Sequence, residues 1–340
     1  FQAEDGIRDD ISCLVGSEMC IRDSRPLVFG VLGEEEGRWV VSSESCGLDI
    51  IGATYLDDVR PGEIVHFRHG APEPVRRQWC DDPPRLCVFE MIYFARPDSR
   101  FFGDSLYSYR VRIGHTLARE TPVPSDIVIG VPDSGIAAAI GYSEESGIPY
   151  GDGLIKNRYV GRTFIQPTQA MREAGIRVKL NPLPDVLEGK RVVVIDDSIV
   201  RGTTSRKLVQ ALRDAGATEV HMRISSPPVT HPCFYGIDTD TQDHLIAARL
   251  SLAEIERHLG VDSLAYLSQE GMLESAHTAS AHFCTACFDG RYPIEIDDSI
   301  RSSKLMLEPA GMARKVLELS LIHISEPTRL LRRSRMPSSA

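Results

Sequence analysis

The feature that most constrains the fold is the stretch Arg191–Ser205, RVVVIDDSIVRGTTS. Its β-branched run, Val192 to Ile195, predicts a strand that is buried on both faces. A polar turn containing a glycine follows, and KLVQALRDAGA then has the spacing of an amphipathic helix that ends at Gly216. A strand, a glycine turn and a helix start in this order direct backbone N–H groups at a phosphate. We therefore expect a phosphate-bearing ligand at this turn.

The side chains of the turn fit such a ligand. Gly202 lets the backbone approach closely, and the hydroxyls are further donors. Two adjacent carboxylates cannot face a phosphate, but they can bind sugar hydroxyls or a magnesium ion and its waters. The alternative is that Asp197 or Ser198 merely caps the helix. The motif is not a P-loop; it resembles the phosphoribosyl pyrophosphate motif of type I phosphoribosyltransferases. The candidate substrate-binding residues are Asp196, Asp197, Ser198, Arg201, Gly202, Thr203, Thr204 and Ser205.

The pattern around this motif predicts an α/β fold. LCVFEMIYFA is an apolar run, SLYSYRVRIGHTLARE and IAAAIGYSEESG read as helices, and DIVIG and EVHMRI read as strands. Alternating strands and helices indicate a parallel sheet with helices on both faces, and ligands of such sheets collect at the carboxyl ends of the strands. Polar turns are expected there at 131–135, 196–204 and 225–230.

Two further segments are candidates for the same site. In VPDSG, Asp133 and Ser134 follow a predicted strand and could face a pyrophosphate or its metal; an ordinary Pro-Asp turn is the alternative. In GLIKNRYVGRTFIQPT, the cations Lys156, Arg158 and Arg162 lie in a glycine-flanked loop that could close over pyrophosphate as a catalytic lid. The alternative there is a solvated basic loop.

The eight cysteines indicate metal or cluster chemistry in a reducing compartment rather than a disulfide framework. Cys284 and Cys287 form a C-x-x-C, and Cys87 and Cys233 could complete a four-thiolate site for zinc or a [4Fe-4S] cluster. We interpret Cys46 and Cys80 as ordinary thiols. Five histidines in the second half of the chain have no metal-binding spacing, and we expect them to be structural or exposed: His221, His231, His244, His277 and His282.

The net charge of −10 gives no support to a nucleic-acid or anionic-membrane surface. We find no apolar run long enough to span a bilayer and no signal peptide. Residues 1–24 and 319–340 fit no helix or strand period and resemble translated adapter sequence, so we expect them to be non-native. Residues 25–80, up to the linker DDPPR, read as short strands with turns, including LDIIGATYLDD.

The motifs together resemble the amidophosphoribosyltransferase family, in the branch that carries an iron–sulfur cluster. The resemblance rests on CVFEMIYFARPDS, VPDSG, GYSEESGIPY, LIKNRYVGRTFIQPTQ, VVVIDDSIVRGTTS, HPCFYGID and CTACF. It implies a type I phosphoribosyltransferase domain over 81–318, preceded at 25–80 by the last strands of an incomplete N-terminal-nucleophile glutaminase domain. The family's N-terminal cysteine has no counterpart, so glutaminase activity is not expected in this truncated chain.

The same resemblance implies ligands and partners. Ammonia, supplied from glutamine in the intact enzyme, would displace pyrophosphate from 5-phosphoribosyl pyrophosphate to give 5-phosphoribosylamine, the first step of purine synthesis. Ser134, Asp196 and Asp197 are implied as Mg²⁺ positions. Cys87, Cys233, Cys284 and Cys287 are implied as ligands of a [4Fe-4S] cluster. A cytoplasmic homo-oligomer with purine nucleotides as feedback inhibitors is also implied.

Three other interpretations compete with this one. A base-salvage phosphoribosyltransferase would share the phosphate turn but not the four cysteines. A non-catalytic regulator that senses phosphoribosyl pyrophosphate would need a nucleic-acid-binding surface, which the net charge does not support. An inactive fragment is the third.

Overall fold

The computed structural model describes residues 26–33, 38–68, 73–79, 83–157, 180–235, 237, 241–294 and 296, together with the backbone of 10–12. The chain divides into two compact units, Phe1–Pro293 and Ile294–Ala340. The description below concerns the first unit. Among the described helices, none has the length and apolar character needed to cross a membrane.

Two small antiparallel sheets form the N-terminal part. One has the order β3-β2-β4, with β2 at Val28–Leu32, β3 at Trp39–Ser42 and β4 at Ala53–Asp58. The other has the order β1-β5-β6, with β1 at Asp10–Ser12, β5 at Glu63–Arg68 and β6 at Val75–Gln78. Strands β2 to β6 confirm the short strands predicted for residues 25–80.

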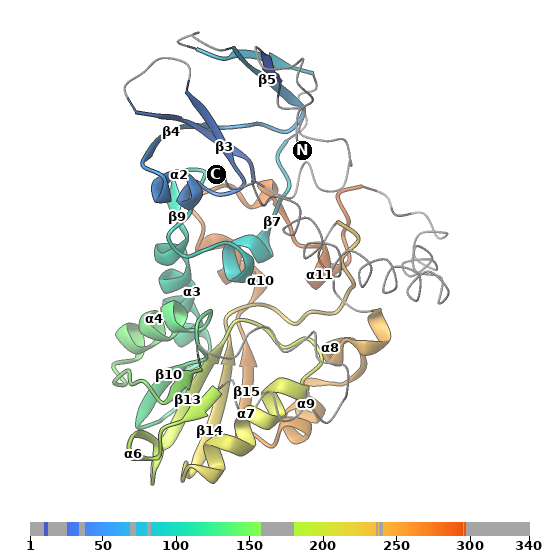
Figure 1. Cartoon of the computed structure of the whole chain (residues 1–340). Helices are drawn as coiled ribbons and strands as arrows, with labels where there is room; N and C mark the ends of the chain where they lie inside the picture. The colour runs from blue at the N-terminus through green and yellow to red at the C-terminus, as the bar shows by residue number, and fades with distance from the viewer. Residues whose placement is uncertain are drawn as a thin grey trace, which may run out of the picture. The chain divides into compact units, whose positions relative to one another are not determined.

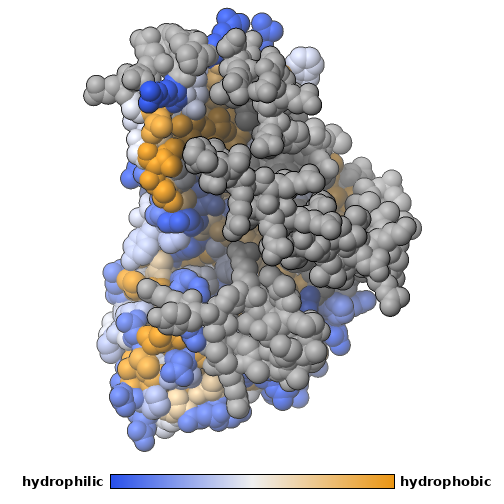
Figure 2. All heavy atoms as spheres, in the orientation of Figure 1, coloured by the Kyte–Doolittle hydropathy of each residue, from blue (hydrophilic) through white to orange (hydrophobic). Residues whose placement is uncertain are grey.

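The segment LDIIGATYLDD was predicted to be a strand. Its second half forms β4, but its first half belongs to the helix α2, Ser45–Ile50, so that part of the prediction was wrong. A helical turn buries Cys46 and Leu48 on one side and leaves Ile50 exposed. Gly52, with φ of +71°, then turns the chain into β4. Large apolar side chains remain exposed over α2 and β4, among them Ile51 and Leu56 (Figure 2).

The second part is built on a four-stranded sheet of order β10-β13-β14-β15, parallel throughout, which confirms the predicted architecture (Figure 1). Its strands are β10 Ile127–Gly130, β13 Arg191–Asp196, β14 Glu219–Ile224 and β15 Ser263–Tyr266. Helices α3 Leu106–Glu120 and α4 Ile136–Ser146 cover one face, and α7 Thr203–Asp214, α8 Ile246–Arg249 and α9 Leu252–Leu259 cover the other (Figure 1).

The two strands β10 and β13 contribute side chains to both cores, as expected of apolar runs that are buried on both faces. In β13, Val193 and Ile195 pack with α3 and α4, whereas Val192 and Val194 pack with α7 and α9. Helices α3 and α4 approach closely because a Cβ on Gly114 would lie only 2.1 Å from the carbonyl oxygen of Ala138.

Short elements connect these layers. They are β7 Leu86–Cys87, the π-helical turn η1 Glu90–Phe94, β8 Arg100–Phe101, β9 Asp104–Ser105, β11 Leu154–Lys156, β12 Leu180–Pro182, α6 Pro184–Leu187, η3 Gln242–His244, α10 Gln269–Glu274, η4 Ser280–His282, β16 Phe283–Cys284 and α11 Ala286–Asp289. The apolar run LCVFEMIYFA is therefore β7 followed by η1.

Candidate functional site

The turns after β10, β13 and β14 meet at the carboxyl edge of the parallel sheet. The amide of Val131 donates to the carbonyl oxygen of Ile195 at 2.8 Å, and that of Ser225 donates to the carbonyl oxygen of Asp196 at 2.9 Å. Gly135 lies so close that a Cβ there would be 2.4 Å from the Ile195 oxygen. The three predicted polar turns are thus brought together, and the backbone contacts between them leave no room for a side chain at Gly135.

Asp197 accepts hydrogen bonds from two of the predicted turns. Its Oδ1 accepts from the Ser134 hydroxyl at 2.8 Å, and its Oδ2 accepts from the Ser198 hydroxyl at 2.9 Å. Asp197 is buried, whereas Asp196 is only partly buried. Because Ser134 directly precedes α4, this contact places Asp197 on the α4 face of the sheet.

The neighbouring carboxyl group of Asp196 has a different environment. Burial raises the pKa of Asp196 well above its usual value, and the negative charge of Asp197 raises it further. The amide of Asp197 donates to Asp196 Oδ1 at 2.9 Å and partly offsets this effect. Two adjacent carboxyl groups also form an oxygen-donor pair suited to a divalent cation.

The phosphate turn leads into α7 as expected, but no side chain caps the helix. The N-cap residue is Gly202, with φ of +78°, so the alternative in which Asp197 or Ser198 caps α7 is wrong. Thr203 and Thr204 are exposed on the first turn, and Ser205 is buried. The first amides of a helix have no acceptor within it, so those of α7 need an acceptor from outside the helix.

The back of this turn is fixed by a second segment. The amide of Ile246 donates to the carbonyl oxygen of Val200 at 2.9 Å. A Cβ on Gly202 would lie 2.7 Å from Ile246 Cδ1. Glycine is therefore required at position 202 both by its positive φ and by this packing. Arg201, next to it, is exposed.

Of the three predicted lid cations, the structure describes only Lys156, at the end of β11. Its Nζ forms an ion pair with the carboxylate of Asp133 in the turn after β10. The two candidates are thus adjacent, as expected for one site. Arg158 and Arg162 lie outside the described residues.

The segments that carry the four predicted cysteine ligands contact one another although they are far apart in the chain. The parallel pair β7–β16 places Cys87 opposite Cys284. The amides of Thr230 and His231 both donate to the carbonyl oxygen of Cys287 at 3.0 Å, which brings the segment of Cys233 to α11. Cys80, Cys13 and Cys20 lie outside the described residues.

The electrostatics of these thiols agree with that arrangement. Burial raises the pKa of Cys87, Cys284 and Cys287. The charges of the other cysteines of the group raise the pKa values of these thiols further, and the group includes Cys233. In the part of the chain that the structure describes, no three His, Cys, Asp or Glu side chains converge as ligands of a single metal ion. Cys46 is buried beside Glu44, as expected of an ordinary thiol.

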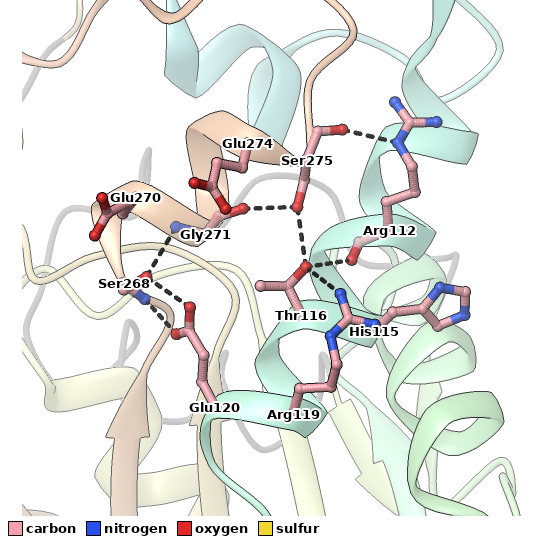
Figure 3. A pocket seen from close by; sticks show the side chains of 10 residues that line it. All are labelled: Arg112, His115, Thr116, Arg119, Glu120, Ser268, Glu270, Gly271, Glu274 and Ser275. Atoms are coloured by element: carbon pink, nitrogen blue, oxygen red, sulfur yellow. Dashed lines mark hydrogen bonds between the residues drawn. The ribbon is translucent and has the colours of Figure 1, made fainter.

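A separate hollow of about 800 Å³ lies between α3 and α10 (Figure 3). Its polar groups bind one another: the Ser268 hydroxyl donates to Glu120 at 2.6 Å, and Arg119 donates to the Thr116 hydroxyl at 3.0 Å. None of the predicted site residues lines it. We therefore place the candidate site at the carboxyl edge and not in this hollow.

One buried charged residue was missed from the sequence. Arg110 is buried on the apolar face of α3, between Leu106 and Ile113. The sequence held a signal for this residue, because Arg110 is a cation at an apolar position of an otherwise regular amphipathic helix.

Comparison with known proteins agrees with this geometry. A family model described as phosphoribosyl transferase domain matches residues 116–225. An amidophosphoribosyltransferase of Synechococcus elongatus is 69% identical over 287 residues, which cover 84% of this chain and 58% of that protein. The chain belongs to the amidophosphoribosyltransferase family.

Members of the amidophosphoribosyltransferase family also match in structure. The glutamine phosphoribosylpyrophosphate amidotransferase from Bacillus subtilis, complexed with ADP and GMP, has a TM-score of 0.74 and 51% identity. That match covers 81% of this chain and 61% of the other. The Bacillus subtilis amidophosphoribosyltransferase sequence is 49% identical over 313 residues, which cover 87% of this chain and 65% of that protein. The chain thus spans less than two thirds of the length of these relatives.

Proposed function

We propose that this chain carries the phosphoribosyl-transfer activity of an amidophosphoribosyltransferase. Ammonia would attack the anomeric carbon of 5-phosphoribosyl pyrophosphate, and pyrophosphate would leave, giving 5-phosphoribosylamine. The observation that carries the proposal is the hydrogen bond from Ser134 to Asp197, which joins the VPDSG turn to the phosphate turn at the carboxyl edge.

The phosphate turn is the proposed site of the 5′-phosphate. The exposed hydroxyls of Thr203 and Thr204 and the first amides of α7 form one cluster of donors. Ser198, Arg201 and Ser205 complete the proposed set on this turn. Gly202 would contribute to this site by giving the turn its left-handed conformation and by leaving room for Ile246 behind it.

The other end of the substrate would lie at Asp133 and Lys156, with Asp196 and Asp197 orienting the ribose between the two ends. The amine of Lys156 is a suitable partner for the leaving pyrophosphate, because its positive charge lies beside Asp133 in the turn after β10. We extend the same role to Arg158 and Arg162 from the sequence motif. Neutral ammonia is already a nucleophile and needs little activation. The group that needs stabilisation is the leaving pyrophosphate, on which negative charge develops.

Magnesium fits the oxygen donors of Ser134, Asp196 and Asp197. When bound, Mg²⁺ would neutralise charge on the pyrophosphate group. The residues of the chain contribute the orientation: the Ser134 hydroxyl holds one oxygen of Asp197 and the Ser198 hydroxyl holds the other.

We further propose that Cys87, Cys233, Cys284 and Cys287 hold a [4Fe-4S] cluster. Four thiols from three separate segments, with Cys87 opposite Cys284, have the donor chemistry that such a cluster requires. Because the cluster would join β7, α11 and the segment after β14, its contribution would be to stability.

The remaining features of the family are proposals for the intact protein. Glutamine would be the source of ammonia, and β2–β6 would be the last strands of the glutaminase domain. The protein would be a cytoplasmic homo-oligomer that purine nucleotides inhibit by feedback. The Bacillus subtilis structure in complex with ADP and GMP supports the nucleotide proposal. No role in nucleic-acid binding is proposed.

The test is magnesium-dependent release of pyrophosphate from 5-phosphoribosyl pyrophosphate by the full chain, purified without oxygen. We expect release with ammonia and none with glutamine. Binding of the substrate without turnover would instead favour the regulator interpretation, and a chain that neither binds nor reacts would favour the inactive fragment.

A further inference from the structure

The turn that carries Cys284 and Cys287 is too short to be stable by itself. Its helix α11, Ala286–Asp289, has only four residues and ends at Gly290, with φ of +71°. A helical segment of this length gains too little from its own hydrogen bonds to offset the loss of chain entropy. Contacts from other groups must therefore hold the two cysteines in place.

The carboxylate of Asp289 supplies three of these contacts. Its Oδ2 accepts from Thr285 Oγ1 at 2.9 Å and from Gln269 Nε2 at 3.0 Å. Its Oδ1 accepts from the amide of Arg291 at 2.9 Å. Thr285 lies between the two cysteines of the C-x-x-C. One side chain thus connects the start of the turn, the residues that follow it and a separate segment.

That separate segment is fixed to the core of the transferase part. Gln269 is the first residue of α10. The hydroxyl of Tyr109 on α3, a fully buried residue, donates to the carbonyl oxygen of Met272 in α10 at 3.2 Å. The bond from Gln269 to Asp289 therefore ties the cysteine turn to an element that α3 holds in place.

The backbone of the same turn is bound independently by the segment that leads to Cys233. The Thr230 hydroxyl donates to the carbonyl oxygen of Phe288 at 2.7 Å, in addition to the bonds of residues 230 and 231 to the Cys287 carbonyl. These contacts use main-chain oxygens and do not involve the Asp289 carboxylate. Removing that carboxylate should loosen the turn without detaching it.

We propose that Asp289 is a positioning residue for the four-cysteine site, which holds Cys284 and Cys287 in the arrangement that the bound metal group requires. The inference rests on the proposed function, since it concerns the cluster site proposed there. Groups that hydrogen-bond around metal ligands orient those ligands and contribute to metal affinity. Asp289 would act through the turn and would not itself bind the metal group.

The charge of Asp289 and its hydrogen bonds have opposite effects on metal retention. Burial raises the pKa of the Cys284 thiol, and the negative charge of Asp289 raises it further. Because thiolates are the metal ligands, this charge by itself disfavours metal binding. Removing the carboxylate would therefore slow metal loss if charge dominated and would speed it if positioning dominated.

The chain offers a matched control in Asp262. Its Oδ2 accepts from the amide of Val220 at 2.7 Å and from Arg213 Nη2 at 2.8 Å. Asp262 directly precedes β15, at the end of the parallel sheet opposite to the carboxyl edge. A purely structural role would give Asp289 and Asp262 the same phenotype.

The experiment uses the full chain purified without oxygen and compares wild type with Asp289→Ala, Asp289→Asn and Asp262→Ala. Loss of iron to an Fe²⁺ chelator is followed by visible absorbance and iron assay, and Tm is measured in parallel. We expect Asp289→Ala to lose iron about tenfold faster than wild type. Asp289→Asn should be intermediate, because its carboxamide keeps one acceptor oxygen. Asp262→Ala should lower Tm while leaving the rate of iron loss within about twofold.

An unchanged or slower loss of iron in Asp289→Ala would overturn the inference, as would an equal acceleration in Asp262→Ala. If Asp289→Ala fails to fold, Thr285→Val decides, because it removes one donor and keeps a side chain of similar size. Faster iron loss in Thr285→Val supports the inference, and the wild-type rate refutes it.

The outcomes also separate this inference from the proposals on which it rests. A wild-type chain that holds zinc instead of iron refutes the cluster alone, because the same comparison of zinc loss then decides the role of Asp289. A wild-type chain that binds neither metal refutes the metal site and the inference together. Release of pyrophosphate tests the transfer reaction separately, since the proposed substrate site lies at the carboxyl edge of the sheet.

Discussion

The hydroxyl of Ser134 and the carboxylate of Asp197 are joined by a hydrogen bond of 2.8 Å across the ends of two neighbouring parallel strands. The bond connects two turns that lie far apart in the sequence. The bond orients the carboxyl group of Asp197, and the hydroxyl that donates it carries no net charge. Asp197 can therefore remain available to a sugar hydroxyl or a cation.

Replacing Asp197 by Asn should lower ammonia-dependent pyrophosphate release by about 100-fold or more, since a preorganised charge at the reacting substrate is lost. The control is Asp126→Asn at the opposite edge of the same sheet, where Asp126 pairs with Arg191 at the surface. That variant should keep the wild-type rate. A rate in Asp197→Asn within a few-fold of wild type would contradict the site assignment, as would equal loss of activity and of folding.

Replacing Asp133 by Asn should strengthen inhibition by free pyrophosphate by about two- to fivefold, the scale of an exposed ion pair. The carboxylate of Asp133 forms an ion pair with the amine of Lys156, so pyrophosphate must compete with Asp133 for that amine. Inhibition constants for Asp133→Asn and for the control Asp152→Asn, an exposed acid near the same strand that accepts from Tyr150, measure the effect. Weaker inhibition would assign Asp133 to direct binding of the substrate or its metal.

Replacing Gly114 by Ala should lower the free energy of unfolding by about 1–3 kcal/mol, the usual range for an overpacked contact. The added methyl would meet the Ala138 carbonyl oxygen, and two helix backbones would have to separate. Urea unfolding measures the change, and Ser108→Ala on the exposed side of α3 serves as the control. Equal stability of both variants would show that the two helices can move apart freely.

Replacing Cys87 or Cys284 by Ser should abolish the visible iron–sulfur absorbance and lower Tm, whereas Cys46→Ser should retain the absorbance. The first two thiols are opposite each other on β7 and β16, and Cys46 lies on α2. Iron and acid-labile sulfide assays on anaerobically purified protein give the answer. Stoichiometric zinc without iron would replace the cluster proposal by a zinc site.

Lowering the pH should destabilise the folded chain partly by protonating Asp126. Its hydrogen bonds from Arg191 lower the pKa of Asp126 from 3.8 to about 2 in the folded chain. A carboxyl group with a depressed folded-state pKa stabilises the fold above its unfolded pKa, and this stability is lost as the pH falls from 3.8 toward about 2. Unfolding midpoints of Asp126→Asn should therefore vary less with pH in that window than those of wild type, and parallel curves would contradict the assignment.

The sequence predicted the parallel sheet and the site turns because their signals are local. The β-branched run before Asp196 favours a buried strand, and Gly202 can adopt the left-handed conformation that the turn after this strand uses. Helix α2 was missed because six residues carry too little periodicity, and burial of Leu48 decided its conformation. The contacts of Arg110 with Met91 and Ala95 were not predictable, since they depend on how η1 packs against α3.

The pairing of β7 with β16 has a consequence for how the chain is made. Arg85 donates to the carbonyl oxygen of Ala281, a residue 196 positions further along, and Cys87 lies opposite Cys284. During synthesis the first thiol leaves the ribosome long before its partner exists, and contacts of such long sequence separation form slowly. Until then Cys87 is open to oxidation or stray metal. Expression under reducing conditions should therefore raise the yield of folded chain.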